Sequence, residues 1–195
     1  MADIPGIGFP GSPGVDRSRL PEAQVRPLQE PGSPYLYWPT PDGHASSSSS
    51  PAHRRAFADT TVMDTNELVR WIFEGMELPG IASDYHHLLQ GGVRQLWARR
   101  RPAPDGLRFV ETFAALDLTL IEAAPEAIAM DERDPSRGFS RLAAVETWMR
   151  LLETEGALRD AVAVGRRAQR FGEGYRSEEL EGKAAALDAE GSAHV

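Results

Sequence analysis

The stretch LRFVETFAALDLTLIEAA, residues 107–124, contains the most strongly apolar face in the chain. Its large apolar side chains recur every three or four residues, which is the spacing of one face of an α-helix. They are Phe109, Val110, Phe113, Leu116, Leu120 and Ile121. Gly106 lies before the stretch, and Pro125 interrupts the pattern after it. We therefore predict a helix over residues 107–124 that packs its apolar face against other helices.

Two further helices are predicted on the N-terminal side of this stretch. The first begins at Asp64, where Glu67 stands three residues later as the partner of a capping box, and it ends at residues 78–80. The second runs from about Ser83 to residue 101 and contains a pair of glycines at positions 91 and 92. Glycine costs roughly 1 kcal/mol against alanine inside a helix, so such a pair either admits a close neighbour or marks a kink.

Three more helices are predicted on the C-terminal side, over residues 139–155, 157–171 and 177–187. Gly156 is a C-cap glycine between the first two, and the connection is so short that they form an antiparallel hairpin. The expected fold class is therefore all-α, a small helical bundle of five to six helices with an antiparallel C-terminal hairpin. This helical domain spans residues 61–187, and residues 188–195 are expected to fray.

Residues 1–60 are predicted to be a disordered tail. Ten of the fifteen prolines fall here, and proline removes a backbone donor and excludes its neighbour from the helical region. A run of five serines, residues 46–50, has the composition of a flexible linker. The helical domain is therefore expected to begin at about residue 61.

An island of large side chains interrupts the polar tail at Tyr35, Leu36, Tyr37 and Trp38. Aromatic residues provide a large contact area at a low cost in conformational entropy, and such islands often anchor onto a partner. The alternatives are that the island packs on the chain's own helices, or that it reflects neutral drift. We take these four residues as the candidate partner-binding segment.

The composition excludes several classes of function. The formal net charge is −8, almost all of it after residue 60, which disfavours binding to nucleic acids and to anionic membranes. The absence of cysteine excludes disulfides, thiolate metal sites and cysteine catalysis. No apolar run is long enough to span a bilayer and no secretory signal is visible, so we expect a cytoplasmic protein. Arginine greatly outnumbers lysine, which indicates a GC-rich coding sequence of bacterial type.

The candidate residues for chemistry lie on the two helices around residues 83–124. His86 and His87 are adjacent, so they point about 100° apart and are poorly placed to bind one metal ion. Asp117 interrupts the apolar face of its helix and is either a tuned acid or, more simply, the partner of an arginine. If these side chains and the gap at Gly91 and Gly92 lined one pocket between the two helices, the chain could bind a small ligand.

A cluster of arginines near the end of the helix from residue 83 is a further candidate. Arg94, Arg99, Arg100 and Arg101 could hold an acidic partner or a phosphate group. The alternative is a surface cluster that complements the negative end of the helix dipole.

Three functional hypotheses follow. The first is a non-enzymatic helical adaptor or accessory subunit that binds a protein partner and uses the N-terminal tail as an extended docking segment. The second is a small-ligand sensor or helical enzyme with the pocket described above. The third is a subunit of a helical homo-oligomer, because four tryptophans leave apolar area to share. No catalytic residue, metal or cofactor is predicted.

Overall fold

The computed structural model describes residues 1–24, 28–29, 35–40, 43–47, 49–131, 134 and 137–192. Within these residues it contains seven α-helices: α1 (Pro51–Ala56), α2 (Thr65–Glu77), α3 (Ala82–Ala98), α4 (Leu107–Ala123), α5 (Ala143–Thr154), α6 (Leu158–Ala168) and α7 (Glu178–Ser192). Three short strands precede them: β1 (Leu28–Gln29), β2 (Leu36–Thr40) and β3 (Gly43–Ser47). The structure is mostly helical, so the predicted all-α class is confirmed, but the three strands lie within residues 1–60, which we expected to be a disordered tail.

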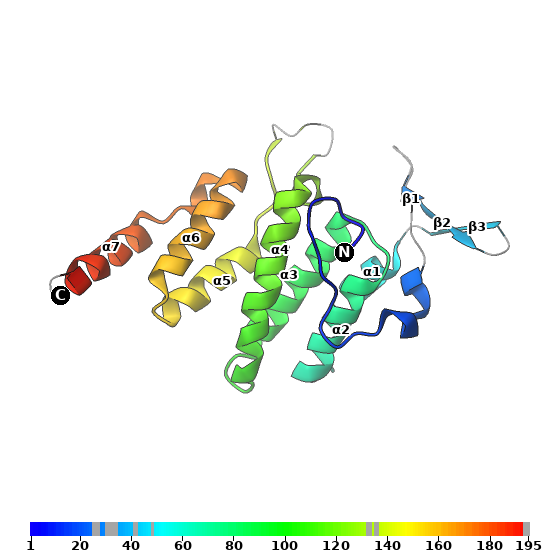
Figure 1. Ribbon diagram of the computed structural model, residues 1–195, viewed down its shortest axis with the longest axis horizontal. Coiled ribbons are helices and arrows are strands. Elements are labelled where there is room, and N and C mark those ends of the chain that lie inside the picture. Colours follow the sequence, from blue (N-terminus) through cyan, green and yellow to red (C-terminus); the bar gives the residue numbers. More distant parts are fainter. Residues whose placement is uncertain are drawn as a thin grey trace.

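The helices are arranged along a long axis, with α3 and α4 side by side in the middle (Figure 1). Helices α1 and α2 cover α3 on one side, and α5, α6 and α7 follow in succession on the other. The apolar face of α4 lies at the centre, where six of its residues are essentially inaccessible to solvent: Val110, Phe113, Ala114, Leu118, Leu120 and Ile121. The stretch with the strongest helical pattern is therefore the central helix of the core.

The six predicted helices correspond to α2 through α7. The predicted capping box is present at the start of α2, where Glu67 N–H donates to the Asp64 carboxylate and Asp64 N–H donates to that of Glu67. Helix α5 packs against α6, and α7 packs against α6 and extends to Ser192, beyond its predicted end. None of the helices in the described ranges is long and apolar enough to cross a membrane.

Helix α1 lies inside the segment that we expected to be a disordered linker. Its N-cap is Ser50, the last residue of the serine run, whose hydroxyl accepts a hydrogen bond from His53 N–H at 2.9 Å. Pro51 occupies the first helical turn, where the absence of an N–H costs nothing. The helical part of the chain therefore begins about ten residues earlier than the predicted boundary.

The first 24 residues also differ from the expected tail, because they lie against the helices. Met1, Ile7 and Ala23 are buried in the same core as the helical residues. Ser12 fastens the segment to α2: its hydroxyl donates to the Phe73 carbonyl at 2.8 Å, and its N–H donates to the Glu77 carboxylate. A few apolar side chains suffice here, since the segment docks on a surface that the helices already form and needs no core of its own.

The three strands form an antiparallel sheet in the order β1-β2-β3, at the end of the molecule that carries α1 (Figure 1). β2 pairs with β3 from Leu36 opposite Ser47 to Thr40 opposite Gly43. Within the described residues, β1 pairs with the first two residues of β2.

The two adjacent glycines of α3 have different surroundings. A Cβ atom on Gly92 would lie 2.3 Å from Cδ1 of Ile72, a side chain buried in the core on α2. A Cβ atom on Gly91 would meet no heavy atom within 4 Å. Of these two glycines, only Gly92 is therefore required by the close approach of α2 to α3.

The pair provides a matched test of helix packing. We expect Gly92→Ala to destabilise the protein by about 1–2 kcal/mol, because overpacking costs roughly 1–3 kcal/mol and the gain in helix propensity offsets part of it. We expect Gly91→Ala to stabilise it by up to about 1 kcal/mol. Urea denaturation of both variants measures the two changes, and equal effects at the two positions would contradict the packing described here.

Candidate functional site

A buried carboxylate ties α1 to α3. Asp84 is only 3% exposed and accepts hydrogen bonds from the Ser50 hydroxyl at 2.7 Å and from Ile81 N–H at 3.0 Å. Its other oxygen lies 3.0 Å from Nδ1 of His53. These three residue types also occur in hydrolytic triads, but here the serine hydroxyl donates to the aspartate and not to the histidine ring. The arrangement caps two helices and gives the hydroxyl no hydrogen bond to the histidine ring that would activate it in a triad.

His86 and Asp117 form a second buried pair, between α3 and α4. Nδ1 of His86 lies 2.8 Å from Oδ1 of Asp117, and the two side chains are 2% and 0% exposed. Burial raises the pKa of Asp117 above its ordinary value, and the hydrogen bond and charge of His86 act in the opposite direction. The simpler expectation of an arginine partner for Asp117 is wrong, because its partner is His86 on the neighbouring helix α3.

The five residues proposed to line one pocket do not lie together, although Gly91 and Gly92 both border one hollow of about 200 Å³. His86 and Asp117 are in the core between α3 and α4, and Gly92 faces α2. His87 and Gly91 lie on another side of α3, where they line a cavity that also involves α1 and α5. A single ligand pocket containing both histidines and Asp117 does not form.

The cavity lined by His87 and Gly91 has a volume of about 350 Å³. Its aromatic walls are Phe57, at the end of α1, and Trp97, near the end of α3, and its polar lining includes Gln90 and Arg94. Burial lowers the pKa of His87 below its ordinary value, and the neighbouring His86 and His53 lower it further, while Asp84 opposes the change. His87 is therefore predominantly neutral at pH 7.

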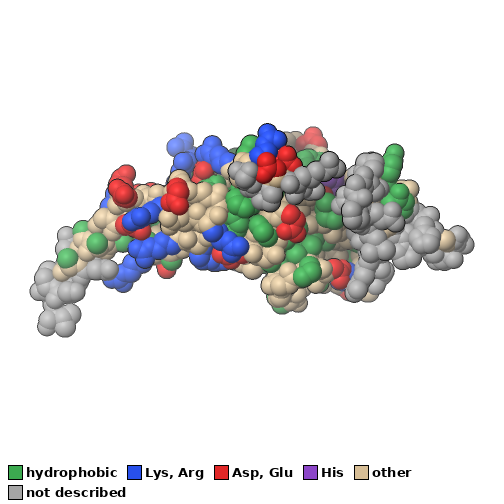
Figure 2. Space-filling model, turned by 90° about the horizontal axis from the view of Figure 1, so that it is seen from above, with side chains coloured by type: hydrophobic (Ala, Val, Ile, Leu, Met, Phe, Trp, Pro, Cys, Tyr) green, Lys and Arg blue, Asp and Glu red, His purple; other side chains and the backbone are tan. Residues whose placement is uncertain are grey.

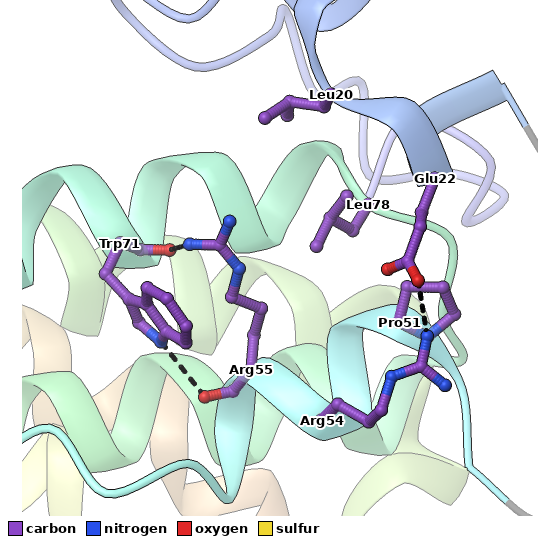
Figure 3. A pocket seen from close by; sticks show the side chains of 7 residues that line it. All are labelled: Leu20, Glu22, Pro51, Arg54, Arg55, Trp71 and Leu78. Atoms are coloured by element: carbon purple, nitrogen blue, oxygen red, sulfur yellow. Dashed lines mark hydrogen bonds and ion pairs between the residues drawn. The ribbon is translucent and has the colours of Figure 1, made fainter.

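A second hollow of about 370 Å³ opens between the N-terminal segment, α1 and α2 (Figure 3). We call it the α1–α2 groove. Figure 3 shows the ion pair of Glu22 with Arg54, 2.7 Å long, at one end, with Leu78 in the middle of the groove. Arg55 and Trp71 lie at the other end. The groove thus has an apolar centre and charged ends.

Trp71 and Arg55 hold each other rigidly in this groove. The guanidinium carbon of Arg55 lies 3.7 Å from the centre of the indole ring, and the indole N–H donates to the Arg55 carbonyl at 3.1 Å. The guanidinium also forms an ion pair of 2.9 Å with Glu74. From the sequence Trp71 is only one more member of an apolar helix face, and Arg55 falls in the expected tail, so no signal identified this pair.

The aromatic island predicted to bind a partner forms part of the sheet. Tyr35 precedes β2 and is 49% exposed, and the side chain of Tyr37 is half-buried. Leu36 and Trp38 are in β2, but their side chains are outside the described part of the structure. Three residues of the island therefore lie in a strand, and Tyr35 lies directly before it, instead of in an irregular tail.

No group of three histidine, aspartate or glutamate side chains that could hold a metal ion occurs within the ranges that the structure describes. The chain matches no known family model, no curated protein and no solved structure.

The buried Asp117 gives the protein a specific pH dependence. Because its pKa in the folded state lies above the ordinary value of 3.8, the folded protein retains this proton when the unfolded chain has lost it. This contribution to stability is complete below pH 3.8 and is lost as the pH rises through the raised pKa. We therefore expect Asp117→Asn, which does not titrate, to gain stability relative to the unaltered protein over that interval. Urea denaturation at a series of pH values measures the difference, and a pH-independent difference would contradict the raised pKa.

Proposed function

We propose that the chain is a non-enzymatic helical adaptor that binds a protein partner, with residues 35–38 as the docking segment. The observation that carries the proposal is the exposed Tyr35, at 49%, beside a strand that contains two further aromatic residues. Tyrosine and tryptophan are enriched among the residues that dominate binding energy at protein interfaces.

The form of the sheet supports a protein partner over a small molecule. β1 covers two of the five residues of β2, and β3 is an edge strand in the described sheet. The backbone groups along such an edge can pair with an extended segment of another protein, while neighbouring side chains provide selectivity. The edge strand β3, which pairs with the aromatic strand β2, is suited to this mode of binding.

The α1–α2 groove supports the same conclusion, because α1, which lines it, lies at the same end of the molecule as the sheet (Figure 1). Its centre contains Leu20 and Leu78, and the rigid Trp71–Arg55 pair borders it. Tryptophan and arginine are both common at the energetic centres of interfaces. A partner that docks on the sheet can therefore extend its contact into this groove.

The non-enzymatic part of the proposal rests on the roles of the titratable side chains that the sequence offered for chemistry. His86 is hydrogen-bonded to Asp117 within the core, and Asp84 accepts the bonds that hold α1. These groups stabilise contacts between helices. This structural role explains why buried titratable residues occur here and requires no catalytic role for them.

The proposal is tested by substitution of the aromatic island. We expect the variant Tyr35→Ala, Tyr37→Ala, Trp38→Ala to lose the proteins that the unaltered chain retains in a pull-down from its native cell. The binding loss is expected to exceed tenfold, because truncation of one central aromatic residue typically costs about 2 kcal/mol or more.

The matched control is Met130→Ala, which removes a side chain that is 63% exposed at a distance from the sheet in the chain. It is expected to leave the retained proteins unchanged. Light scattering on the same variants determines whether the captured partner is a second copy of the chain. Equal recovery by the triple variant and the control would reject the aromatic island as the docking segment.

A further inference from the structure

We propose that the cavity between α1, α3 and α5 is a binding site for a small aromatic carboxylate. We call it the α3 cavity, since His87, Gly91, Arg94 and Trp97 of that helix line it. The site is distinct from the surface proposed to bind a protein partner, and it does not depend on that proposal. Its volume of about 350 Å³ lies at the lower end of the range for small-molecule pockets, roughly 300–1,000 Å³, which suits a ligand with one or two rings.

The walls of the cavity are suited to a flat ring. Phe57 is 60% exposed, yet its position is fixed by ring contacts to His53 at 4.5 Å and to His87 at 5.3 Å. Trp97 provides a second aromatic wall. An aromatic ligand inserted beside Phe57 would cover apolar surface that is otherwise open to water, and aromatic pairs contribute about 0.5–1.5 kcal/mol beyond the buried area.

The charge of the cavity selects an anion. The side chain of Arg94 lines it and makes no hydrogen bond or ion pair with any part of the chain that the structure describes. Two other members of the same arginine cluster are engaged: the guanidinium of Arg99 donates to the Met63 carbonyl at 2.6 Å, and that of Arg100 donates to the Trp97 carbonyl at 2.9 Å. A free guanidinium at the edge of an apolar cavity matches the two oxygens of a carboxylate.

The remaining polar groups limit the ligand to one negative charge. His87 is predominantly neutral at pH 7, so it offers a hydrogen bond and not a second cation. The Gln90 carboxamide is held in place, since its oxygen accepts a hydrogen bond from Ala143 N–H at 3.0 Å. One arginine with two neutral hydrogen-bonding groups therefore fits a monocarboxylate.

Gly91 provides an independent indication that the open volume of the α3 cavity has a function. Glycine within a helix costs roughly 1 kcal/mol against alanine, and no neighbour in the structure requires it here, because a Cβ atom would meet nothing within 4 Å. The absence of a side chain at Gly91 keeps the cavity open. Gly91 also borders an adjoining hollow of about 200 Å³, which shares Phe57 and Arg94 with the cavity.

Isothermal titration of the full chain with phenylacetate, 3-phenylpropionate and indole-3-acetate tests the proposal. We expect at least one of them to bind with a stoichiometry near one. Benzyl alcohol, which lacks the charge, and acetate, which lacks the ring, are expected to bind at least tenfold more weakly. If none of the three aromatic carboxylates gives saturable binding up to about 10 mM, the proposal is overturned.

Two variants locate the site. Arg94→Gln is expected to weaken binding by roughly 10- to 100-fold, the usual effect of losing a hydrogen bond to a charged group. Gly91→Leu fills the cavity from a position with open space around it, so binding is expected to be lost while the chain stays folded by circular dichroism. The control is Arg70→Gln, which changes another exposed arginine on a different helix.

Unchanged affinity in Arg94→Gln, or an equal loss in the Arg70→Gln control, would place the ligand elsewhere and overturn the proposal. The pull-down with the Tyr35, Tyr37 and Trp38 variant probes a separate surface. Its outcome and that of the titration can therefore be told apart.

Discussion

Two hollows beside α1, the α1–α2 groove and the α3 cavity, depend on the carboxylate of Asp84. It is buried, and it accepts hydrogen bonds from Ser50 and Ile81 while its second oxygen contacts His53. Because Ser50 and His53 belong to the first turn of α1, the carboxylate fixes that helix on α3. Helix α1 in turn provides one wall of the α1–α2 groove and one wall of the α3 cavity. A single buried acid therefore positions one wall of each hollow. On the face that Figure 2 shows, hydrophobic side chains are exposed over part of the half of the molecule that contains α1, and Lys and Arg side chains gather over the C-terminal helices.

The helical class and the positions of six helices could be predicted because local patterns determine them. The apolar spacing of residues 107–124 requires a helix with one covered face, and Asp64 with Glu67 marks the start of α2. The glycine pair was recognised as unusual, yet its meaning needed the structure. Only the position of Ile72 on α2 reveals that Gly92 permits a close contact and that Gly91 does not.

Contacts between residues far apart in the sequence could not be predicted. His86 and Asp117 are 31 positions apart, and the partner of Asp117 depends on how α3 and α4 are rotated about their axes. The N-terminal segment posed the same difficulty, since proline and glycine argue against helices and strands but not against docking on an existing surface. Ser50 appeared to belong to a linker, and its role as a helix cap depends on Asp84, 34 residues later.

Helix α1 has only six residues, which is too short for a helix to persist by itself in water. Its order is supplied by Asp84 at one end and by the stack of Arg55 on Trp71 further along. Detachment of this one turn and a half would be a local unfolding event that leaves the packing of α3 on α4 intact. Both hollows would be lost together in that event, and the protection of the α1 amide protons against exchange with solvent reports how rarely it occurs.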